Sequence, residues 1–354
     1  MILERFKTVF GHEAQISGFT PGRVNLIGEH TDYNGGMVLP TALKLGGSLA
    51  VEPRNDNKIR IWSVKFADIS ERTVLDKATK HWSDYITGAI ILATQQGYLN
   101  GGADIAVETT LPFGAGISSS AAVTVGILKL ARDMAKADTP DKEIAVLARQ
   151  VENDFIGMPC GIMDQMAVAI ANPGQALALN TETLDYELID LPKDYHMAVI
   201  HSGQFRKLNE GRYKERKEEC DAIKAKLGHD NICQISDDEF TKLSPLPEAL
   251  QRRARHCMTD HRRTVRAAQC LRENDIDTLG HLMNESHMSM RDDFEITVPK
   301  VDALVEDAVK FGALGARQTG GGFGGCIVAC IANDNLEEWK TRLLTAHPES
   351  FWVA

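Results

Sequence analysis

The sequence contains no C-x-x-C pair, no apolar run long enough to cross a bilayer and no excess of positive charge. Its seven cysteines are odd in number and scattered, which argues against a disulfide framework and a cysteine zinc cluster. A membrane helix needs about 18 apolar residues. Charges at Glu4, Arg5, Lys7 and Glu13 interrupt the N-terminal segment, which therefore lacks the apolar core of a signal peptide. We expect a chain that stays out of membranes and resides in the reducing cytoplasm.

The charge balance excludes a general attraction for nucleic acid. The 354 residues carry 39 Lys and Arg against 49 Asp and Glu, a formal net charge of −10. Six arginines between residues 252 and 266 lack interleaved aromatic residues, so they predict a solvated helix face. With 43% hydrophobic and 25% charged residues, the composition is typical of a globular chain of two domains. An anionic ligand must therefore be held by local geometry.

Hydrophobic periodicity predicts a mixed α+β chain. Alternating apolar and polar residues predict strands at 58–64 and 104–111, and an apolar stripe predicts a helix at 141–155. Residues 118–131 carry one charge, Lys129, which is typical of a buried central helix. Asn172-Pro173-Gly174 is a turn signal, so we predict one domain at 1–173 and a second, also α+β, at 174–354.

The first unusual segment is residues 21–36, PGRVNLIGEHTDYNGG. Its density of hydrogen-bonding groups exceeds what an ordinary turn needs. Glu29, His30 and Asp32 could bracket the hydroxyls of a sugar, because carboxylates accept hydrogen bonds and imidazole can donate or accept. The alternatives are a solvated turn and a metal triad of the same three residues, although adjacent residues of an extended chain point apart.

The second segment, residues 111–122, has the sequence LPFGAGISSSAA and leads from a predicted strand into the predicted buried helix. Gly114 and Gly116 would let backbone N–H groups approach a ligand, and a helix N-terminus favours an anion such as phosphate. The three serines could complete the phosphate site or ligate Mg²⁺. The alternative is simple N-capping, for which one serine would suffice. The chain has no Walker A loop, because no Gly-Lys-Ser/Thr occurs.

The third segment, residues 317–326, has the sequence RQTGGGFGGC. Gly320, Gly322 and Gly325 satisfy G-x-G-x-x-G, but a strand-like run at 326–331 follows where a dinucleotide-binding fold needs a helix. We therefore reject a dinucleotide site. A hairpin turn remains the alternative to a functional loop.

Two carboxylates lie between these segments. Glu152 is at the edge of the apolar stripe of the helix predicted at 141–155, where a bound cation would compensate its charge. Asp164 follows a Pro/Gly turn among apolar neighbours. Either residue could be a buried structural acid, and beside a phosphate loop a catalytic base or a metal ligand is the competing interpretation.

In order and spacing, the three segments resemble the signature motifs of the GHMP small-molecule kinases. Residues 22–33 are similar to the N-terminal signature of the galactokinases within that family, and residues 160–165 and 286–294 are also galactokinase-like. The resemblance implies a two-domain α+β fold, with a ribosomal-S5-like N-terminal domain, a ferredoxin-like C-terminal domain and the active site in the cleft between them. It also implies ATP-dependent phosphorylation of the anomeric hydroxyl of D-galactose, the first step of galactose catabolism, with Mg²⁺ as cofactor.

The resemblance assigns roles position by position. Asp164 and Arg23 would be catalytic, and Ser120 and Glu152 would ligate Mg²⁺. The residues implied to contact galactose are Glu29, His30, Thr31, Asp32, Gly161 and Tyr213. The residues implied to contact ATP are Gly114, Ala115, Gly116, Ile117, Ser118, Ser119, Ser120, Ser63 and Trp82.

Two other functions remain open at this stage. One is an N-acetylgalactosamine kinase or another sugar 1-kinase of the same family, and the other is a galactose sensor without kinase activity. Such sensors are shortened at the Ser-Ser-Ser-Ala loop, which is complete here at residues 118–121. We expect small-molecule partners, no nucleic acid or membrane partner, and a monomer or a weak homo-oligomer.

Overall fold

The computed structural model describes residues 1–112, 114–205 and 210–354, which form two compact units. The first consists of Met1–Arg23, Ala42–Leu111 and Ser118–Ala171, and the second of Val24–Thr41, Pro112–Ile117 and Asn172–Ala354. The last of these segments begins two residues before the predicted boundary. The compact units nevertheless differ from a single division at that boundary, because two earlier segments belong with the C-terminal half of the chain.

The strands of the first unit form a sheet in the order β3-β6-β4-β5. β6 is antiparallel to β3 and parallel to β4, and β5 is antiparallel to β4. The alternation of apolar and polar residues that predicted β4 matches the burial of its side chains, since Ile59 and Ile61 are buried while Lys58 is exposed. The strands predicted at 58–64 and 104–111 are therefore confirmed. The strands are β1 (Ile16–Asn25), β3 (Pro40–Pro53), β4 (Lys58–Ser63), β5 (Ile69–Thr73) and β6 (Ala103–Thr109), and β1 and β3 continue into the second unit.

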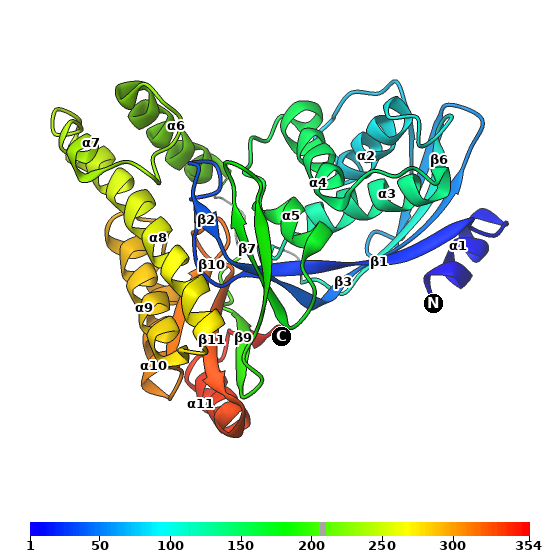
Figure 1. Cartoon of the computed structure of the whole chain (residues 1–354). Coiled ribbons are helices and arrows are strands. Elements are labelled where there is room, and N and C mark those ends of the chain that lie inside the picture. The colour runs from blue at the N-terminus through cyan, green and yellow to red at the C-terminus, as the bar shows by residue number, and fades with distance from the viewer. Residues whose placement is uncertain (113, 206–209) are drawn as a thin grey trace. The chain divides into compact units, whose positions relative to one another are not determined.

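The buried central helix is α3 (Ser119–Ala135), and its prediction is confirmed. It contacts α2, α4 and α5, so neighbouring helices cover several of its faces (Figure 1). Its predicted lone charge, Lys129, donates a hydrogen bond to the carbonyl of Ala169 and pairs with Asp141. The other helices of this unit are α1 (Ile2–Phe10), α2 (Asp84–Gln95), α4 (Asp141–Gln150) and α5 (Met163–Ile170).

The helix predicted at 141–155 changes its hydrogen-bonding pattern at its C-terminal end. α4 ends at Gln150, and a π-helical turn, η1 (Val151–Ile156), continues it. The carbonyl of Glu152 accepts from the backbone N–H groups of Gly157 and Met158. π-helical turns are rare and often occur at functional sites. Here the turn contains Glu152, one of the two carboxylates that the sequence points to.

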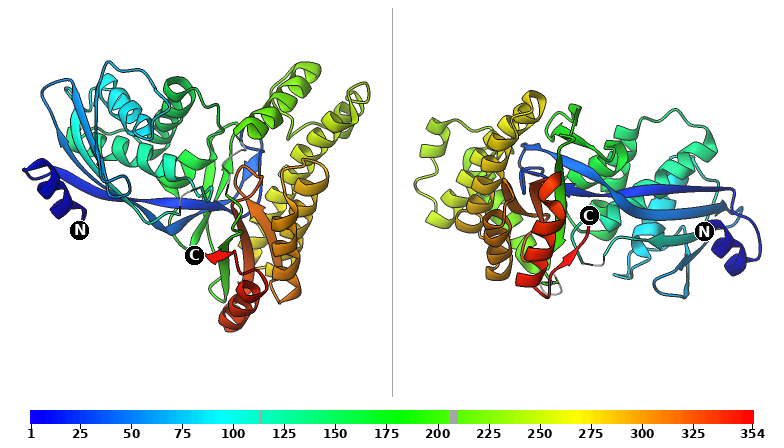
Figure 2. Two further views of the ribbon diagram at one scale, coloured as in Figure 1. Left: turned by 180° about the vertical axis from the view of Figure 1, so that it is seen from behind. Right: turned by 90° about the horizontal axis from the view of Figure 1, so that it is seen from below.

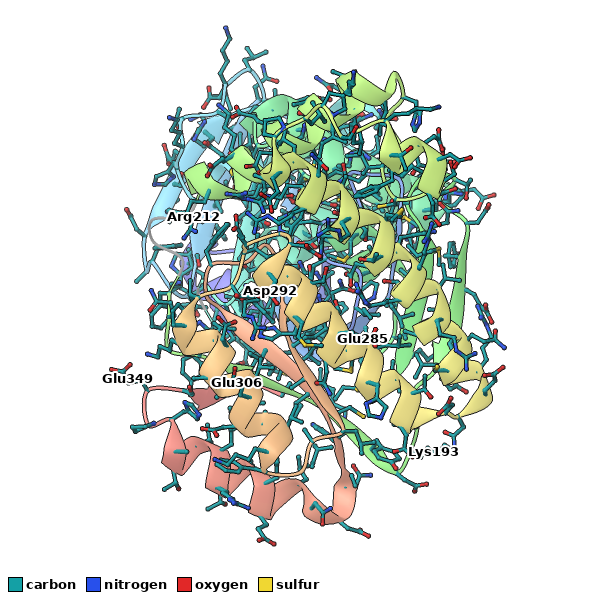
Figure 3. The ribbon with its side chains drawn as sticks, turned by 90° about the vertical axis from the view of Figure 1, so that its left-hand side faces the viewer. Lys193, Arg212, Glu285, Asp292, Glu306 and Glu349 are labelled. Carbon is teal, nitrogen blue, oxygen red and sulfur yellow. The ribbon has the colours of Figure 1, made fainter. Side chains whose placement is uncertain are left out.

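The second unit contains an antiparallel sheet in the order β10-β11-β9-β12. Helices α8, α9 and α10 lie side by side (Figures 1 and 2), and α9 and α10 pack against β10. Glu285 and Asp292 of α9 and Glu306 of α10 are exposed (Figure 3), whereas Leu304 of α10 is buried in the core.

The strands of the second unit are β2 (Met37–Val38), β7 (Gln175–Asn180), β8 (Tyr186–Asp190), β9 (Tyr195–His201), β10 (Gly315–Thr319), β11 (Cys326–Ala332) and β12 (Phe351–Trp352). Its helices are α6 (Glu210–Leu227), α7 (Asp237–Thr241), α8 (Glu248–Glu273), α9 (Ile276–Asp292), α10 (Pro299–Lys310), η2 (Asn333–Asn335) and α11 (Leu336–Ala346).

One arginine of the face that the sequence predicts to be solvated is not exposed to solvent. Arg253 is buried and forms ion pairs with Glu219 and Glu295.

The third glycine-rich segment joins β10 to β11. These strands are antiparallel, with Thr319 opposite Cys326, so a strand follows the glycines and the rejection of a dinucleotide fold is confirmed. Four of the glycines, Gly320, Gly322, Gly324 and Gly325, have positive φ, which glycine adopts without steric cost. The hairpin interpretation is therefore correct for the backbone.

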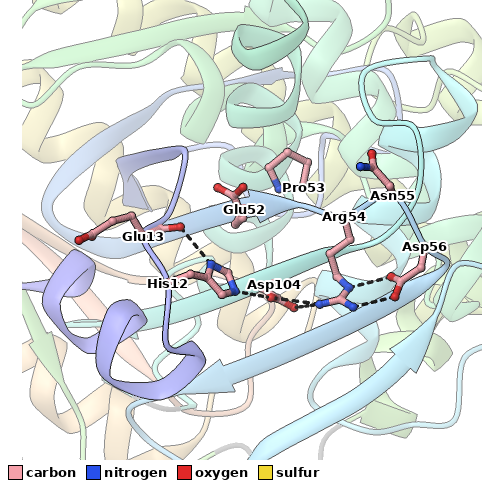
Figure 4. A pocket seen from close by; sticks show the side chains of 8 residues that line it. All are labelled: His12, Glu13, Glu52, Pro53, Arg54, Asn55, Asp56 and Asp104. Carbon is pink, nitrogen blue, oxygen red and sulfur yellow. Dashed lines mark hydrogen bonds and ion pairs between the residues drawn. The ribbon is translucent and has the colours of Figure 1, made fainter.

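Beneath α1, an ion-pair network surrounds Asp104. This buried carboxylate contacts Arg54, Arg60 and His12, and the groove of about 570 Å³ beside it is lined by further charged residues (Figure 4). Burial raises the pKa of Asp104, but the arginines outweigh this effect and the net pKa is lowered. None of the site residues predicted from the sequence lines this groove.

Within the described ranges, no helix is both long and apolar enough to span a membrane.

Candidate active site

Asp164 joins three segments that are distant in the sequence. It lies in the first turn of α5, and its Oδ1 accepts hydrogen bonds from Arg23 Nε at 2.8 Å and from Arg23 Nη2. Its Oδ2 accepts from Ser118 Oγ at 2.7 Å. The Arg23 side chain is buried, whereas that of Asp164 is 31% exposed. This carboxylate is therefore held from one side by a cation and a hydroxyl, while part of it stays accessible to a ligand.

Glu152 lies beside this group without a cationic hydrogen-bond partner among the described contacts. Gln165 Nε2 donates to its Oε1 at 2.9 Å. Burial raises the pKa of Glu152 to about 7, and repulsion by Asp164 adds to the rise. Hydrogen bonds to Gln165 and Ser120 oppose the rise without cancelling it. A buried acid in this state favours a nearby cation, which would compensate its charge.

The donor set fits a hard divalent cation. The carboxylate of Glu152 and the hydroxyl of Ser120 are the oxygen ligands that Mg²⁺ prefers, and Mg²⁺ commonly takes its remaining ligands from water and substrate phosphates. No group of three or more His, Cys, Asp or Glu within the described ranges could hold a metal by itself. A metal triad of Glu29, His30 and Asp32 is accordingly not observed among the described residues.

The second segment has the backbone that the phosphate interpretation requires. Gly114, Gly116 and Ser118 have φ of 70°, 71° and 64°, and the residues between them do not have positive φ. Such alternation turns successive N–H groups toward one side and forms a concave anion site. The side chains of Ala115 and Ile117 are buried. The ATP contacts of this loop remain a prediction, and at the buried Ala115 and Ile117 we expect them to come from the backbone.

The three serines do not act as simple caps. Ser118 occupies the N-cap position of α3, but its side chain makes no capping hydrogen bond and donates to Asp164 instead. Ser120 hydrogen-bonds to Glu152, and Ser119 is exposed. The N-capping interpretation is wrong for Ser118, because its hydroxyl serves the predicted catalytic acid.

The first segment is fixed within the second unit, and Glu29 is its most firmly held side chain. Glu29 is buried, and its Oε1 accepts from the backbone N–H of Gly320 at 2.8 Å. Its own backbone N–H donates to Asp260, and its carbonyl accepts from His256 Nε2. Gly28 has φ of 93°, and a Cβ there would lie 2.6 Å from the Met37 carbonyl oxygen. This turn is therefore held by specific hydrogen bonds and close backbone packing, and the interpretation as a solvated turn is wrong.

The neighbours of Glu29 have different environments. The buried ring of His30 contacts Tyr213 and Phe294, and its Nδ1 lies 2.6 Å from the hydroxyl of Tyr33. Thr31 directs its hydroxyl to the carbonyls of Gly28 and Met37, which is a structural use of that group. Asp32 is half-buried in the following turn. The structure thus brings His30 and Tyr213 together, and the sugar contacts of this segment remain a prediction.

The remaining predicted residues lie in the first unit. Trp82 stacks on Phe66 with 4.6 Å between ring centroids, and Phe66 is exposed. Ser63 is buried at the end of β4, where its hydroxyl accepts from the Lys65 N–H. Gly161 is buried three residues before Asp164. Phe66, the stacking partner of Trp82, was not singled out from the sequence.

The sequence argument also did not identify the residues that hold the carboxylates of Glu152 and Glu29. Gln165, which holds Glu152, lay inside the quoted segment 160–165 without a role. Arg317 Nη1 and Thr319 Oγ1 lie 3.5 and 3.3 Å from Glu29 Oε1, although the glycine-rich segment carried no ligand assignment. Spacing alone could not reveal these contacts, since 288 residues separate Glu29 from Arg317.

Comparison with known proteins gives a consistent result along the chain. Residues 4–53 match the galactokinase galactose-binding signature, residues 76–172 the N-terminal domain of GHMP kinases, and residues 267–340 their C-terminal domain. A galactokinase of Exiguobacterium sibiricum is 37% identical over 99% of this chain and 94% of its own length.

Solved structures agree with the sequence matches. The crystal structure of Lactococcus lactis galactokinase complexed with galactose has a TM-score of 0.92 and 32% identity, covering 99% of this chain and 96% of that one. Methanococcus jannaschii mevalonate kinase has a TM-score of 0.69 at 19% identity, covering 95% and 97% of the two chains, which shows a shared fold.

Proposed function

This chain belongs to the galactokinase family of GHMP kinases, and from that premise we propose how its residues divide the work of phosphorylating galactose. The fold is the two-domain α+β fold of the GHMP kinases. The enzyme is an ATP-dependent sugar kinase whose acceptor is the anomeric hydroxyl of D-galactose. The individual roles below are supported by the contacts of each residue.

The observation that carries the mechanism is the fixed carboxylate of Asp164. Arg23 and Ser118 hold its two oxygens, while nearly a third of the side chain stays exposed. A carboxylate in this state can orient an attacking hydroxyl and accept its proton. The guanidinium of Arg23 balances the charge of Asp164, and it would also stabilise negative charge developing on the attacking oxygen.

The loop at residues 114–120 is assigned to the phosphates of ATP. Its alternating backbone supplies N–H donors, and phosphoryl transfer depends mainly on positioning and charge stabilisation. Glu152 and Ser120 would hold Mg²⁺, which supplies positive charge to the phosphate oxygens when bound. Gln165 orients Glu152 toward that role through its amide.

The sugar is assigned to the first segment. Glu29, His30 and Asp32 would hold its hydroxyls, with Tyr213 beside His30. Trp82 and Ser63 would lie near the nucleotide. The cysteines form no disulfide in the described part of the chain, which supports the proposed cytoplasmic location.

A substrate panel tests this function. Galactose, N-acetylgalactosamine, glucose and mevalonate are each incubated with ATP and Mg²⁺, and phosphorylated product and ADP are quantified. We expect galactose to give the highest kcat/KM, with product blocked at the anomeric carbon. Preferential turnover of N-acetylgalactosamine would assign the chain to the alternative sugar, and ADP formation without sugar phosphate would contradict a kinase.

A further inference from the structure

The carboxylate of Glu29 is held by the third glycine-rich segment. Oε1 accepts from the Gly320 N–H at 2.8 Å, and Thr319 Oγ1 and Arg317 Nη1 lie 3.3 and 3.5 Å away. Among the described residues, no hydrogen bond reaches Oε2. The protein thus holds one oxygen of a side chain that is 2% exposed.

Arg317 is an unusual residue at this position. It lies on β10 with no exposed surface, its ion pair in the described part of the chain is with Glu29, and its charge also helps to lower the pKa of the buried Asp260. The remaining contacts of its guanidinium are the Asn25 carbonyl oxygen at 3.4 Å and the Met290 sulfur at 3.2 Å. A buried charge is costly unless it is paired, and a buried pair with this long separation is a weak source of stability. Stability alone therefore explains Arg317 poorly.

The backbone of Glu29 is fixed independently of Arg317. Asp260 accepts from its N–H, His256 donates to its carbonyl, and the left-handed turn at Gly28 precedes it. A change at Arg317 should therefore alter where the carboxylate points and leave the course of the chain intact.

We propose that Arg317 is a positioning residue for sugar recognition, which acts by aiming the Glu29 carboxylate. The Gly320 N–H holds Oε1 by a hydrogen bond, Thr319 Oγ1 shares its proton between the Asn25 carbonyl at 3.0 Å and Oε1 at 3.3 Å, and Arg317 supplies the counter-charge that keeps the carboxylate in that orientation. In this proposal, a residue of the third glycine-rich segment orients a sugar-binding residue of the first segment. This inference rests on the proposed function, because Glu29 contacts the sugar only in that proposal.

The test uses four variants of the full chain: Arg317→Met, Arg317→Lys, Glu29→Gln and the double variant Glu29→Gln/Arg317→Met. Arg253→Met is the matched control, because Arg253 is also buried and ion-paired but does not contact Glu29. Galactose affinity by calorimetry, KM for each substrate, kcat and melting temperature are measured on one preparation of each protein.

We expect Arg317→Met to weaken galactose affinity about tenfold, by analogy with the lower end of the loss that follows removal of a residue supporting a metal ligand. Arg317→Lys should recover part of this loss, and KM for ATP should stay within about twofold of wild type since the loop at 114–120 is unchanged. The double variant should bind galactose no more weakly than Glu29→Gln alone, because Arg317 acts through Glu29. Arg253→Met should lower the melting temperature without changing galactose affinity.

Unchanged galactose affinity in Arg317→Met, with a fall in melting temperature like that of Arg253→Met, would overturn the inference. If Arg317→Met does not fold, Arg317→Lys and Thr319→Val decide, and wild-type galactose affinity in both would overturn it equally. A wild-type protein that neither binds nor phosphorylates galactose would remove the proposed function and this inference together. A wild-type kinase with an unaffected Arg317→Met variant would remove the inference alone.

Discussion

Replacing Asp164 by Asn is the sharpest test of the mechanism. Asparagine keeps the size of the side chain and an oxygen that can accept from Arg23, but it cannot accept a proton under the reaction conditions. A general base contributes roughly 10²- to 10⁴-fold to turnover. We therefore expect kcat to fall by about that factor while galactose and ATP still bind.

The structural cost of this change should be small by comparison. Breaking a fully buried ion pair costs about 3 to 5 kcal/mol, and an exposed pair contributes about 0 to 1 kcal/mol. The Asp164 side chain is 31% exposed, so we expect a loss of roughly 1 to 2 kcal/mol, between these limits. Domains typically have about 5 to 15 kcal/mol of stability, so the variant should remain folded and lost turnover would report on chemistry.

The matched control is Asp141→Asn. Asp141 pairs with Lys129 and Arg132 in the same unit, and it is 41% exposed. We expect a comparable loss of stability and unchanged turnover. Single-turnover kinetics, calorimetry with each substrate and thermal unfolding are compared for both variants. Nearly full turnover by a folded, ligand-competent Asp164→Asn protein would refute the role of this carboxylate as a base.

Three further changes test other parts of the molecule. Gly116→Val should weaken ATP binding and leave galactose binding unchanged, because it adds a branched Cβ at φ of 71° in the loop. The control Gly97→Val has φ of 75° in open space and should cost only about 1 to 2 kcal/mol of stability. Equal ATP affinity in both proteins would exclude the loop from the ATP site. Asp32→Ala should weaken galactose binding by about 1 to 3 kcal/mol in calorimetry, and a loss of ATP affinity instead would contradict its assignment to the sugar. Asp104 has a lowered pKa when folded, so its contribution should be present above its unfolded pKa, near 3.9, and be lost as pH falls below that value. Asp104→Asn should therefore lower stability at pH 7 by about 3 to 5 kcal/mol and flatten the acid limb of the unfolding curve, and an unchanged limb would show that other carboxylates control acid unfolding.

The helices and strands near the site could be predicted because their burial follows the periodicity of the sequence. β4 and α3 are examples, since Ile59 and Ile61 of the strand are buried on the same face and α3 is covered by its neighbours. The π-helical turn at Glu152 could not be predicted in this way. The carbonyl of Glu152 accepts from the N–H groups of Gly157 and Met158, which lie further along the chain than the partner in an α-helix. Such a change in the hydrogen-bonding pattern cannot be recognised from composition or from the spacing of apolar residues.

The serines show why motif residues can be found from sequence while their roles cannot. An N-cap residue normally has extended backbone, which lets its side chain accept from the first turn of the helix. Ser118 has φ of 64° and ψ of 43°, a left-handed conformation, and its hydroxyl donates to Asp164 instead. α3 therefore begins without a side-chain cap from Ser118, and its positive end can serve an anion in place of that hydroxyl. N-capping, the alternative that the sequence left open for the serines, therefore fails at Ser118, because its left-handed backbone goes with a hydroxyl that donates to Asp164 and not to the first turn of the helix.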